Sequence, residues 1–552
     1  MADDERMDAE TVTPEHGTPE PVTPEPGTPT GETPAAEAAA PETGEPAETP
    51  VPAPKRTPGA GRRATVVSLR IVRGIVGLAA AAAVVAAVGL VPLTTFGVEP
   101  LGTVVEPEPA DLQTVCPGSL LRLGDESGGE AGSVFPVGTP TLTTAAEPGE
   151  PAASALAGGD ASGSSTAQQP TTLVLPASES AVLAAAQRQD PGGQGGISGL
   201  AATACAEPTS SAWLVGGGTT VGRTSILHLV NPTAVAADVT LELWSESGQV
   251  RAPGMAGITV PAGGRLALPL SGFAPDLASP VVHVEARGGQ VVAWLQTSVT
   301  RVLDPGGVDL VAAGSAPARE LVIPAVRIHN ATAVAGSLGI EGYDDLASII
   351  RLGNPGDEVA NVEVSLTPVT GGASPSTFEV SLAGGEVSDT PLEAAHELGE
   401  EILADGSYLV SVRSDVPVVA GVRTSTIDAP TQRGDGRLVP GDADLAWYAS
   451  AAELREDAAL AVASAASPVL VAVSVDGEAH TLQLVSLEGD GELTVEVPAI
   501  GAVAATLPGG SGYRIRGGEG VAAAVSFAGS GAIASYPVVS PRAADAPLVV
   551  RP

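Results

Sequence analysis

The sequence has 552 residues, of which 68 are Gly and 49 are Pro, while aromatic residues make up only 3%. Its formal net charge is −38, and 51 acidic residues face 19 basic residues from residue 97 onward. The length exceeds that of one ordinary domain, and so acidic a chain is excluded as a nucleic-acid binder, since binding to phosphates needs cationic surface.

Residues 1–70 are predicted to form a disordered, acidic, Thr/Pro-rich cytoplasmic tail with a basic end. Thr-Pro pairs recur at Thr13, Thr18, Thr23, Thr28 and Thr33, and large apolar side chains are scarce. Such a segment buries too little apolar surface to offset the entropy of ordering it. Two hypotheses stay open for it: phosphorylation of these threonines, and a solvated low-complexity extension.

Residues 71–96 are predicted to contain one transmembrane helix. Gly74–Leu93 is a run of twenty residues without a charge, about 30 Å long as a helix and long enough to span a bilayer. Six basic residues between 55 and 73 precede this run, and acidic residues follow it. We therefore expect a plasma-membrane protein with a cytoplasmic N-terminus and an extracytoplasmic C-terminal bulk. A cleaved secretory signal and an Ala-rich core helix are the alternatives.

Residues 97–206 are rich in Gly, Ser and Ala and are predicted to form a partly ordered extracytoplasmic stalk, with candidate strands at 134–142 and 171–182. Cys116 and Cys205 are the two cysteines of the chain, and both follow the predicted membrane span. One disulfide between them is the simplest prediction for an oxidising compartment. The alternatives are two free buried thiols or a metal site, for which two thiols are too few ligands.

An internal repeat begins after residue 206. Leu227–Leu243 (LHLVNPTAVAADVTLEL) aligns without gaps on Ile350–Leu366 (IRLGNPGDEVANVEVSL), which pairs two Asn-Pro steps. A second alignment places Val291–Ser298 on Val418–Ser425, and Val521–Ala528 is a looser third copy. The chain therefore repeats about every 95 to 125 residues, which predicts three similar domains.

The repeats have the pattern of short strands. Apolar and polar residues alternate from Val239 to Leu243, as in a half-buried strand, and Asn-Pro and Gly-Gly steps mark turns. We therefore predict an all-β fold of tandem immunoglobulin-like antiparallel sandwiches. The predicted boundaries are 207–315, 316–440 and 441–541, followed by a C-terminal tail at 542–552. Residues 392–403 and 451–459 are expected to be helical.

The order of four short segments resembles a known family. These segments are CPG at 116–118, CAEP at 205–208, SAWLVGGGTTVGRTSILHLVNP at 211–232 and DPGGVDLV at 304–311. Together they resemble the actinobacterial, membrane-anchored domain-of-unknown-function family numbered 5719. The resemblance implies a cell-envelope location and implies no activity, cofactor or catalytic residue.

A search for residues with catalytic or ligand-binding patterns predicts no catalytic, cofactor or metal site and no bound cofactor. The sequence contains neither a G-x-S-x-G elbow nor a phosphate-binding loop. His228 and His283 lie on predicted strands and are interpreted as structural. The tryptophans are assigned to cores, with sugar stacking as the alternative. Loop Ca²⁺ binding by acidic residues stays a minor hypothesis, for Asp304, Asp309, Asp344 and Asp345.

The function expected from these observations is that of a non-enzymatic, single-pass cell-envelope protein. Its outer sandwiches would bind or scaffold another envelope component, through sheet edges and loops. The expected partners are the membrane, through one span, and other envelope proteins or a cell-wall polymer. An accessory factor in cell-wall glycopolymer assembly is the alternative, and a hydrolase assembled from distant residues is the third hypothesis.

Overall fold

The structure is a computed structural model, and it describes residues 103–105, 110–124, 133–156, 165–178, 180–301, 303–338, 340, 342–371, 374–392, 403–432, 438–539 and 548–550. The chain divides into two compact units, Met1–Val98 and Glu99–Pro552, and all described residues belong to the second. The predicted tail and membrane segment thus lie outside the described residues. Within the part of the chain that is described, no helix is both long and apolar enough to cross a bilayer.

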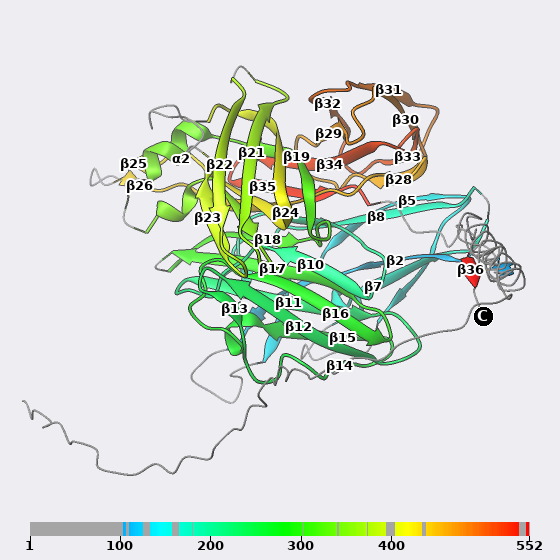
Figure 1. Cartoon of the computed structure of the whole chain (residues 1–552), viewed down its shortest axis with the longest axis horizontal. Helices are drawn as coiled ribbons and strands as arrows, with labels where there is room; N and C mark the ends of the chain where they lie inside the picture. Colours follow the sequence, from blue (N-terminus) through cyan, green and yellow to red (C-terminus); the bar gives the residue numbers. More distant parts are fainter. Residues whose placement is uncertain are drawn as a thin grey trace, which may run out of the picture. The chain divides into compact units, whose positions relative to one another are not determined.

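Antiparallel strands make up most of the described residues, which confirms the predicted all-β class (Figure 1). One α-helix is described, α2 (Ala331–Ser337). Four short 3-10 helices accompany it in these residues: η1 (Thr166–Gln168), η2 (Gln194–Gly196), η3 (Leu270–Gly272) and η4 (Asp344–Leu346).

The region expected to be a stalk is a folded β unit, here called the N-terminal unit (residues 110–206). Its sheets are β2-β7-β6, β3-β4 and β5-β8-β9. Small side chains such as Ala186 and Ala201 are fully buried in it, so a linker-like composition still provides a core. The strands are β2 (Leu112–Cys116), β3 (Leu120–Leu123), β4 (Val134–Val137), β5 (Thr141–Glu147), β6 (Ala152–Ala155), β7 (Thr171–Leu175), β8 (Val182–Gln189) and β9 (Ala201–Ala204). Separately, β1 (Thr103–Val105) pairs with β36 (Leu548–Val550).

The first sandwich consists of two sheets, β10-β16-β12-β13, with β14 also paired to β12, and β15-β11-β17-β18. Inward residues of both sheets, among them Leu214, Leu229 and Val284, form one core. The strands are β10 (Ser211–Val215), β11 (Arg223–Asn231), β12 (Ala237–Ser245), β13 (Gly248–Val250), β14 (Ile258–Val260), β15 (Gly264–Pro269), β16 (Val281–Gly288), β17 (Val292–Arg301) and β18 (Asp304–Val311).

The second sandwich is built around one long strand, β24 (Gly406–Ile427), that belongs to both of its sheets. The first half of β24 pairs with β19 and β21, and the second half pairs with β20 and β27. Pro417, which has no N–H to donate to a ladder, lies between the halves. The other strands are β19 (Ala318–Ile328), β20 (Ile349–Gly353), β21 (Ala360–Pro368), β22 (Ser376–Leu382), β23 (Val387–Pro391), β25 (Thr431–Gln432), β26 (Leu438–Val439) and β27 (Ala443–Ala449).

The third sandwich pairs the sheets β28-β33-β30-β31 and β32-β29-β34-β35. Its core contains Leu482, Ile515 and Phe527, all fully buried. Figure 1 shows its strands in orange and red. They are β28 (Asp457–Ala461), β29 (Val469–Ser474), β30 (His480–Ser486), β31 (Glu492–Val497), β32 (Ala502–Thr506), β33 (Gly512–Arg516), β34 (Val521–Gly529) and β35 (Ala532–Pro537).

The three sandwiches share one strand order, as the repeat in the sequence predicts. The three aligned segments, at 291–298, 418–425 and 521–528, fall on β17, on the second half of β24 and on β34. Each of these strands pairs with the strand that carries or replaces the Asn-Pro step, namely β11, β20 and β29. The repeat is therefore a repeat of topology as well as of sequence.

The Asn of the repeated Asn-Pro step performs the same task in both copies. The Nδ2 atom of Asn231 donates to the backbone O of Val235 at 2.8 Å, and that of Asn354 donates to the O of Glu358 at 2.6 Å. Both side chains also reach a more distant carbonyl, on Val260 and on Ala383 respectively. Because both Asn residues are buried, these bonds satisfy amides that would otherwise destabilise the turn.

The four β units contact one another in a closed cycle. Gln296 of the first sandwich exchanges two hydrogen bonds with the backbone of Leu121 in the N-terminal unit. Arg351 of the second sandwich bonds to carbonyls of the first, and Val471 of the third packs on Ala325 of the second. The third sandwich then packs on the N-terminal unit, in one apolar cluster. The last strands of the four units meet as well, since β9 contacts β18, β18 contacts β27, β27 contacts β35 and β35 contacts β9.

Two details differ from the predictions. The strand β27 (443–449) pairs with β24 and belongs to the second sandwich, whereas the predicted boundary assigned residues after 440 to the third. Of the two segments expected to be helical, residues 393–402 lie outside the described residues, and residues 451–459 lead into β28. Ala459 is buried there against the N-terminal unit and its own sheet, and such tertiary packing overrides the helix preference of Ala.

Candidate functional site

Three polar side chains form a row on the outer face of one sheet of the first sandwich. Ser211 lies on β10, His283 on the neighbouring strand β16, and Glu242 on β12 beyond it. His283 stands directly opposite Glu242 on one side and opposite Trp213 on the other. Ser211 shares their face, because it lies two residues from Trp213 and side chains alternate along a strand.

The row is continuously hydrogen bonded. His283 Nδ1 lies 2.8 Å from Glu242 Oε2, and His283 Nε2 lies 3.0 Å from Ser211 Oγ. A carboxylate only accepts hydrogen bonds, so Nδ1 carries a proton and donates it to Glu242. In the neutral imidazole Nε2 is then an acceptor, and the Ser211 hydroxyl donates to it.

This order of contacts has a definite chemical capacity. A hydroxyl bonded to an imidazole, which is in turn oriented by a carboxylate, is the arrangement that activates serine as a nucleophile. His283 is placed to take the hydroxyl proton, and Glu242 holds the ring in the tautomer that allows it. The row therefore satisfies the geometric test for a nucleophile, a base and an orienting group.

Aromatic stacking fixes the plane of the imidazole. The ring of Trp213 lies 4.2 Å from that of His283 at an interplanar angle of 14°, and 5.3 Å from that of Trp244 at 24°. The backbone bond from Ala286 N to Ser210 O makes Trp213 and His283 a non-hydrogen-bonded pair, in which side chains approach closely. His283 is thus held by two hydrogen bonds and one stacked ring.

The row is open to solvent on the side of the serine. Ser211 is exposed, the side chain of Glu242 is 42% exposed and that of His283 is 14% exposed. A reagent in solution can therefore reach Ser211 Oγ without any opening of the fold.

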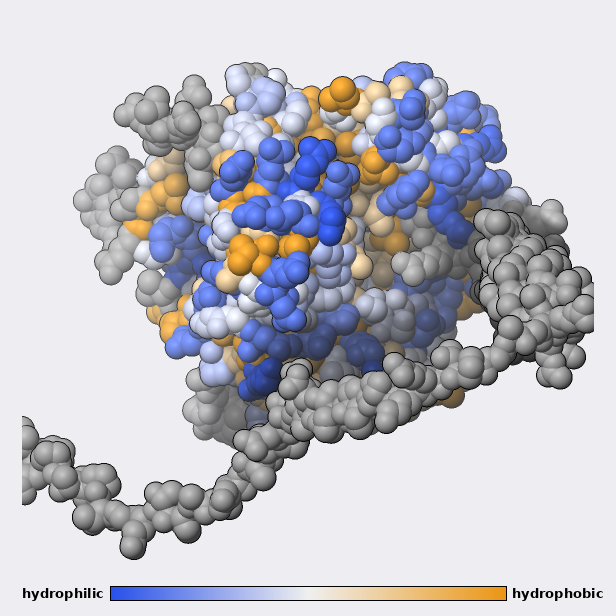
Figure 2. Space-filling model, viewed as in Figure 1, coloured by the Kyte–Doolittle hydropathy of each residue, from blue (hydrophilic) through white to orange (hydrophobic). Residues whose placement is uncertain are grey.

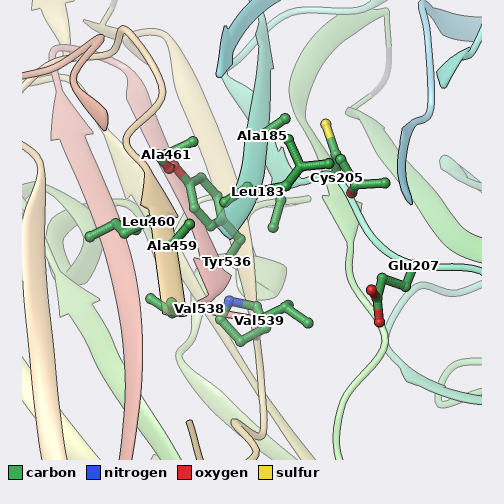
Figure 3. A pocket seen from close by; sticks show the side chains of 14 residues that line it. Leu183, Ala185, Cys205, Glu207, Ala459, Leu460, Ala461, Tyr536, Val538 and Val539 are labelled. Carbon is green, nitrogen blue, oxygen red and sulfur yellow. The ribbon is translucent and has the colours of Figure 1, made fainter. Parts of the chain in front are cut away.

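A small cavity lies elsewhere, between the N-terminal unit and the third sandwich. Figure 3 shows Leu183, Ala185 and Cys205 on one side of it and Leu460, Tyr536 and Val538 on the other. Its volume is about 20 Å³, which is enough for about one water molecule. The Tyr536 hydroxyl is already engaged, since it donates to Ala461 O at 2.9 Å. This cavity is part of a packed seam and is too small for an organic ligand.

A wider, open hollow on the third sandwich is lined by acidic residues. Glu453, Glu456, Asp476 and Glu519 lie around it together with His480. Asp476 Oδ1 lies 2.8 Å from His480 Nε2, and this hydrogen bond lowers the pKa of Asp476 to about 2. One of the four carboxylates, Asp476, is thus already paired with an imidazole.

An arginine cluster lies between the first and second sandwiches. Arg351 forms a bidentate pair with Asp389, at 2.7 and 2.8 Å, and also donates to the carbonyls of Gly217, Ala278 and Pro280. Although burial works against it, Arg351 lowers the pKa of Asp389. The guanidinium of Arg351 lies over the ring of Trp447, 4.6 Å from its centroid. The cost of burying the charge of Arg351 is thereby offset by five hydrogen bonds and by contact with an aromatic ring.

The same cluster continues toward the surface. Arg301 forms a bidentate pair with Asp345, at 2.8 and 2.9 Å, and Arg223 lies 3.6 Å from the same carboxylate. Arg423 donates to the carbonyls of Asp345 and Ala347, and burial, followed by repulsion from Arg223, lowers its pKa to about 10. These charges are used to hold the sandwiches together.

Asp444, on β27, joins all four β units. Its Oδ2 accepts the N–H of Leu200 at 2.8 Å and of Ile533 at 2.9 Å, and its Oδ1 accepts that of Val308 at 3.1 Å. These donors belong to the N-terminal unit, the third sandwich and the first sandwich. Burial raises the pKa of Asp444 to about 8, against the lowering effect of the backbone donors.

A second buried carboxylate, Asp309, lies close to Asp444. It accepts the N–H of Trp447 at 2.7 Å and of Leu310 at 2.8 Å, and burial raises its pKa well above the usual range. The bond to Trp447 crosses from the first sandwich to the second. Both carboxylates therefore serve contacts between units.

The other residues singled out in the sequence have definite places. Cys116 and Cys205 form a disulfide, with 89 residues of separation. Of the calcium candidates, Asp309 is buried on backbone amides and Asp345 is paired with arginines. Among the described residues, no group of three or more His, Cys, Asp or Glu is arranged to hold a metal ion.

Some of the histidines and tryptophans are buried in hydrophobic cores, and others belong to the row of polar residues or stack on it. His228 is buried, bonds to Gln296, and has its pKa lowered to about 3 by burial and by Arg265. Trp244, Trp294 and Trp447 are buried, while Trp213 is partly exposed. The sequence pattern predicted a structural role for His283 and gave no indication of Ser211 or Glu242. The signal that could have found them is strand register, which brings His283 next to residues 41 and 72 positions away in the sequence.

Comparison with known proteins yields a family and little more. A family model described as "Family of unknown function (DUF5719)" matches residues 161–506, more than half of the chain. No curated protein matches. A matching solved structure is titled "Crystal Structure of Thermotoga maritima 1070"; it is 21% identical, with 24% of this chain and 95% of that chain covered and a TM-score of 0.17. So low a score carries no argument.

Proposed function

The chain belongs to DUF5719, a family of unknown function, and from that premise we propose that it is a non-enzymatic scaffold of an actinobacterial cell envelope. In this proposal its β units bind or space another envelope component. One transmembrane helix at residues 71–96 holds the chain in the plasma membrane, with the N-terminus in the cytoplasm and the β units outside. The three sandwiches are immunoglobulin-like modules, and the first seventy residues are a disordered arm.

The observation that best supports a scaffold is the closed cycle of contacts, with Asp444 bonded to all four units. A string of independently moving domains would lose entropy when it bound a partner, whereas units fixed to one another are already organised for binding. Most of the buried charged groups, including Arg351 and Asp309, are committed to contacts between units. This use of charge favours a mechanical role over a catalytic one.

The surface also suits binding rather than the enclosure of a substrate. Figure 2 shows hydrophilic residues over most of the face in view, with separate patches of hydrophobic residues between them. The most exposed large apolar side chains are Val221, at 99%, Ile500, at 92%, and Leu303, at 87%. Val221 and Leu303 lie just beyond the paired ends of β11 and β17, at the same end of the first sandwich, which is here called the tip.

Photo-crosslinking in whole cells tests this proposal. A photoreactive amino acid is placed at Val221 or Leu303 in the full chain, and the matched control carries it at Asp238, an exposed position on β12. We expect a defined adduct with an envelope component from the tip positions and a weaker one from the control. Protease added to intact protoplasts should remove the β units and spare the first seventy residues. The proposal would be contradicted if none of the three positions gave an adduct. It would also be contradicted if the β units resisted protease added to intact protoplasts.

A second candidate, an accessory role in cell-wall glycopolymer assembly, is favoured by Trp213. Its partly exposed indole stacks on His283, whose ring bonds to the polar Ser211 and Glu242, and sugars bind proteins through such combinations of aromatic and polar groups. Binding of purified wall polysaccharide by the wild-type chain, lost in Trp213→Ala and retained in Trp447→Phe, would favour this role. Equal binding by both variants would exclude Trp213 as the sugar contact.

A further inference from the structure

We infer that Ser211 is a covalent acylation site, at which the protein takes up an acyl group from an activated ester. The inference goes beyond the proposed scaffold role, because it assigns a modification to a particular hydroxyl. It rests on the two hydrogen bonds of the row, 3.0 Å from Ser211 Oγ to His283 Nε2 and 2.8 Å from His283 Nδ1 to Glu242 Oε2. It also rests on the exposure of Ser211.

The chemical step uses only these groups and the donor. Ser211 Oγ attacks the carbonyl carbon of the ester and forms a new C–O bond, while its proton passes to His283 Nε2. The bond from the carbonyl carbon to the leaving oxygen breaks, and the proton on Nε2 passes to the departing alcohol or phenol. Glu242 is a positioning residue, because it bonds to Nδ1 and does not touch the reacting atoms.

The product is expected to persist rather than to turn over. An aryl ester has a good leaving group, whereas the acyl-serine formed from it is an ordinary alkyl ester and reacts more slowly. The backbone N–H of Ser211 donates to Thr209 Oγ1 at 3.3 Å, so it is not aimed at a developing oxyanion. Weak stabilisation of that oxyanion slows the attack of water on the acyl-serine. One acyl group per chain is therefore the expected stoichiometry.

The surroundings select the acyl donor by charge. Glu242 and Glu285 lie on the same face as Ser211, and Glu285 is directly opposite it on β16. Arg287 pairs with Glu285 at 3.0 Å and offsets one of these charges, so the repulsion of anionic reagents comes mainly from the carboxylate of Glu242. We therefore expect neutral acyl donors to react faster than donors that carry a carboxylate.

The test is mass spectrometry of the full-length protein after exposure to p-nitrophenyl acetate. We expect one acetyl group per chain, located on Ser211 by peptide mapping, and none there in Ser211→Ala. The internal control is Ser365, a partly exposed strand serine whose hydroxyl bonds to Thr377 Oγ1 instead of an imidazole. His283→Gln should slow labelling of Ser211 by about 100-fold, the usual contribution of a general base, and leave Ser365 unchanged.

Glu242 has its own readout. Glu242→Gln should slow labelling of Ser211, and Glu242→Asp should restore part of the lost rate, which a purely structural contribution would not explain. If Ser211 is labelled no faster than Ser365, the inference is wrong. If circular dichroism shows that His283→Gln is unfolded, the wild-type protein alone tests the inference. The rate of labelling at Ser211 is then compared with the rate at Ser365. Neither result affects the crosslinking test of the scaffold.

Discussion

Replacing Asp444 with Ala should separate the four β units energetically. The substitution leaves three buried backbone N–H groups, on Leu200, Val308 and Ile533, without the oxygens that now accept them. Each orphaned buried donor costs about 1 to 3 kcal/mol, so the free energy of unfolding should fall by about 3 to 9 kcal/mol. The matched control is Asp238→Ala, an exposed residue on β12, for which less than about 0.5 kcal/mol is expected.

Hydrogen exchange followed by mass spectrometry is the discriminating assay for this prediction. Peptides that contain Leu200, Val308 and Ile533 should lose protection together in Asp444→Ala, although they belong to three different units. Calorimetry should show one transition for the wild-type protein and several for Asp444→Ala. If the three peptides keep wild-type protection, or if one alone changes, the role of Asp444 as a common junction is refuted.

The pH dependence of stability gives an independent check on the same residue. Because burial raises the pKa of Asp444 to about 8, the folded protein keeps a proton that the unfolded chain releases near its ordinary value of about 4. The Asp444 contribution to stability is thus full below about pH 4 and is lost as the pH rises toward 8. Denaturant titrations of wild type and Asp444→Ala between pH 4 and 8 should converge with rising pH. Parallel curves would show that Asp444 is ionised in the folded state.

Three further variants probe the remaining contacts. Arg351→Met should lower the free energy of unfolding by about 3 kcal/mol, because Asp389, whose side chain is 25% exposed, loses its partner while water screens part of its charge. The same change at Arg413, which is 71% exposed, should cost less than about 0.5 kcal/mol in denaturant titrations. Replacing both cysteines by Ser should cost about 4.6 kcal/mol by the loop-entropy argument for 89 residues, and an unchanged midpoint would contradict it. Burial lowers the pKa of His228 to about 3, so between about pH 6.5 and 3 only the unfolded chain takes up a proton at this residue. The wild-type protein should therefore lose stability as the pH falls through this range. His228→Gln should lack this loss in denaturant titrations.

The repeat was readable in the sequence because it depends on local signals. The alternation from Val239 to Leu243 appears as buried residues 239, 241 and 243 on β12. The Asn-Pro steps mark turns at Asn231 and Asn354, and their equivalent hydrogen bonds explain why the same residue occupies both places. Strand periodicity and turn chemistry act within a few residues, so a single sequence is enough to reveal them.

The contacts between units were not readable in the same way. Small residues such as Ala186 and Ala201 fill the core of the N-terminal unit, and their abundance in residues 97–206 suggested a stalk. The junction at Asp444 and the row at Ser211 depend on which strands become neighbours and in what register. Those features arise from long-range packing, and a carboxylate buried on three backbone amides looks the same in a sequence as one on a surface loop.

The contact that closes the cycle, between the N-terminal unit and the third sandwich, is the central claim, and an engineered disulfide tests it most directly. A Cβ atom at Gly512, on β33, would lie 3.0 Å from that of Ala145, on β5, so a small shift brings the pair to the separation of about 3.8 Å that disulfides have. The full-length double variant Ala145→Cys/Gly512→Cys should form this bond spontaneously, and peptide mapping after alkylation under denaturing conditions should find residues 145 and 512 linked. Two free thiols at these positions in a folded protein that keeps its native Cys116–Cys205 bond would contradict the closed arrangement.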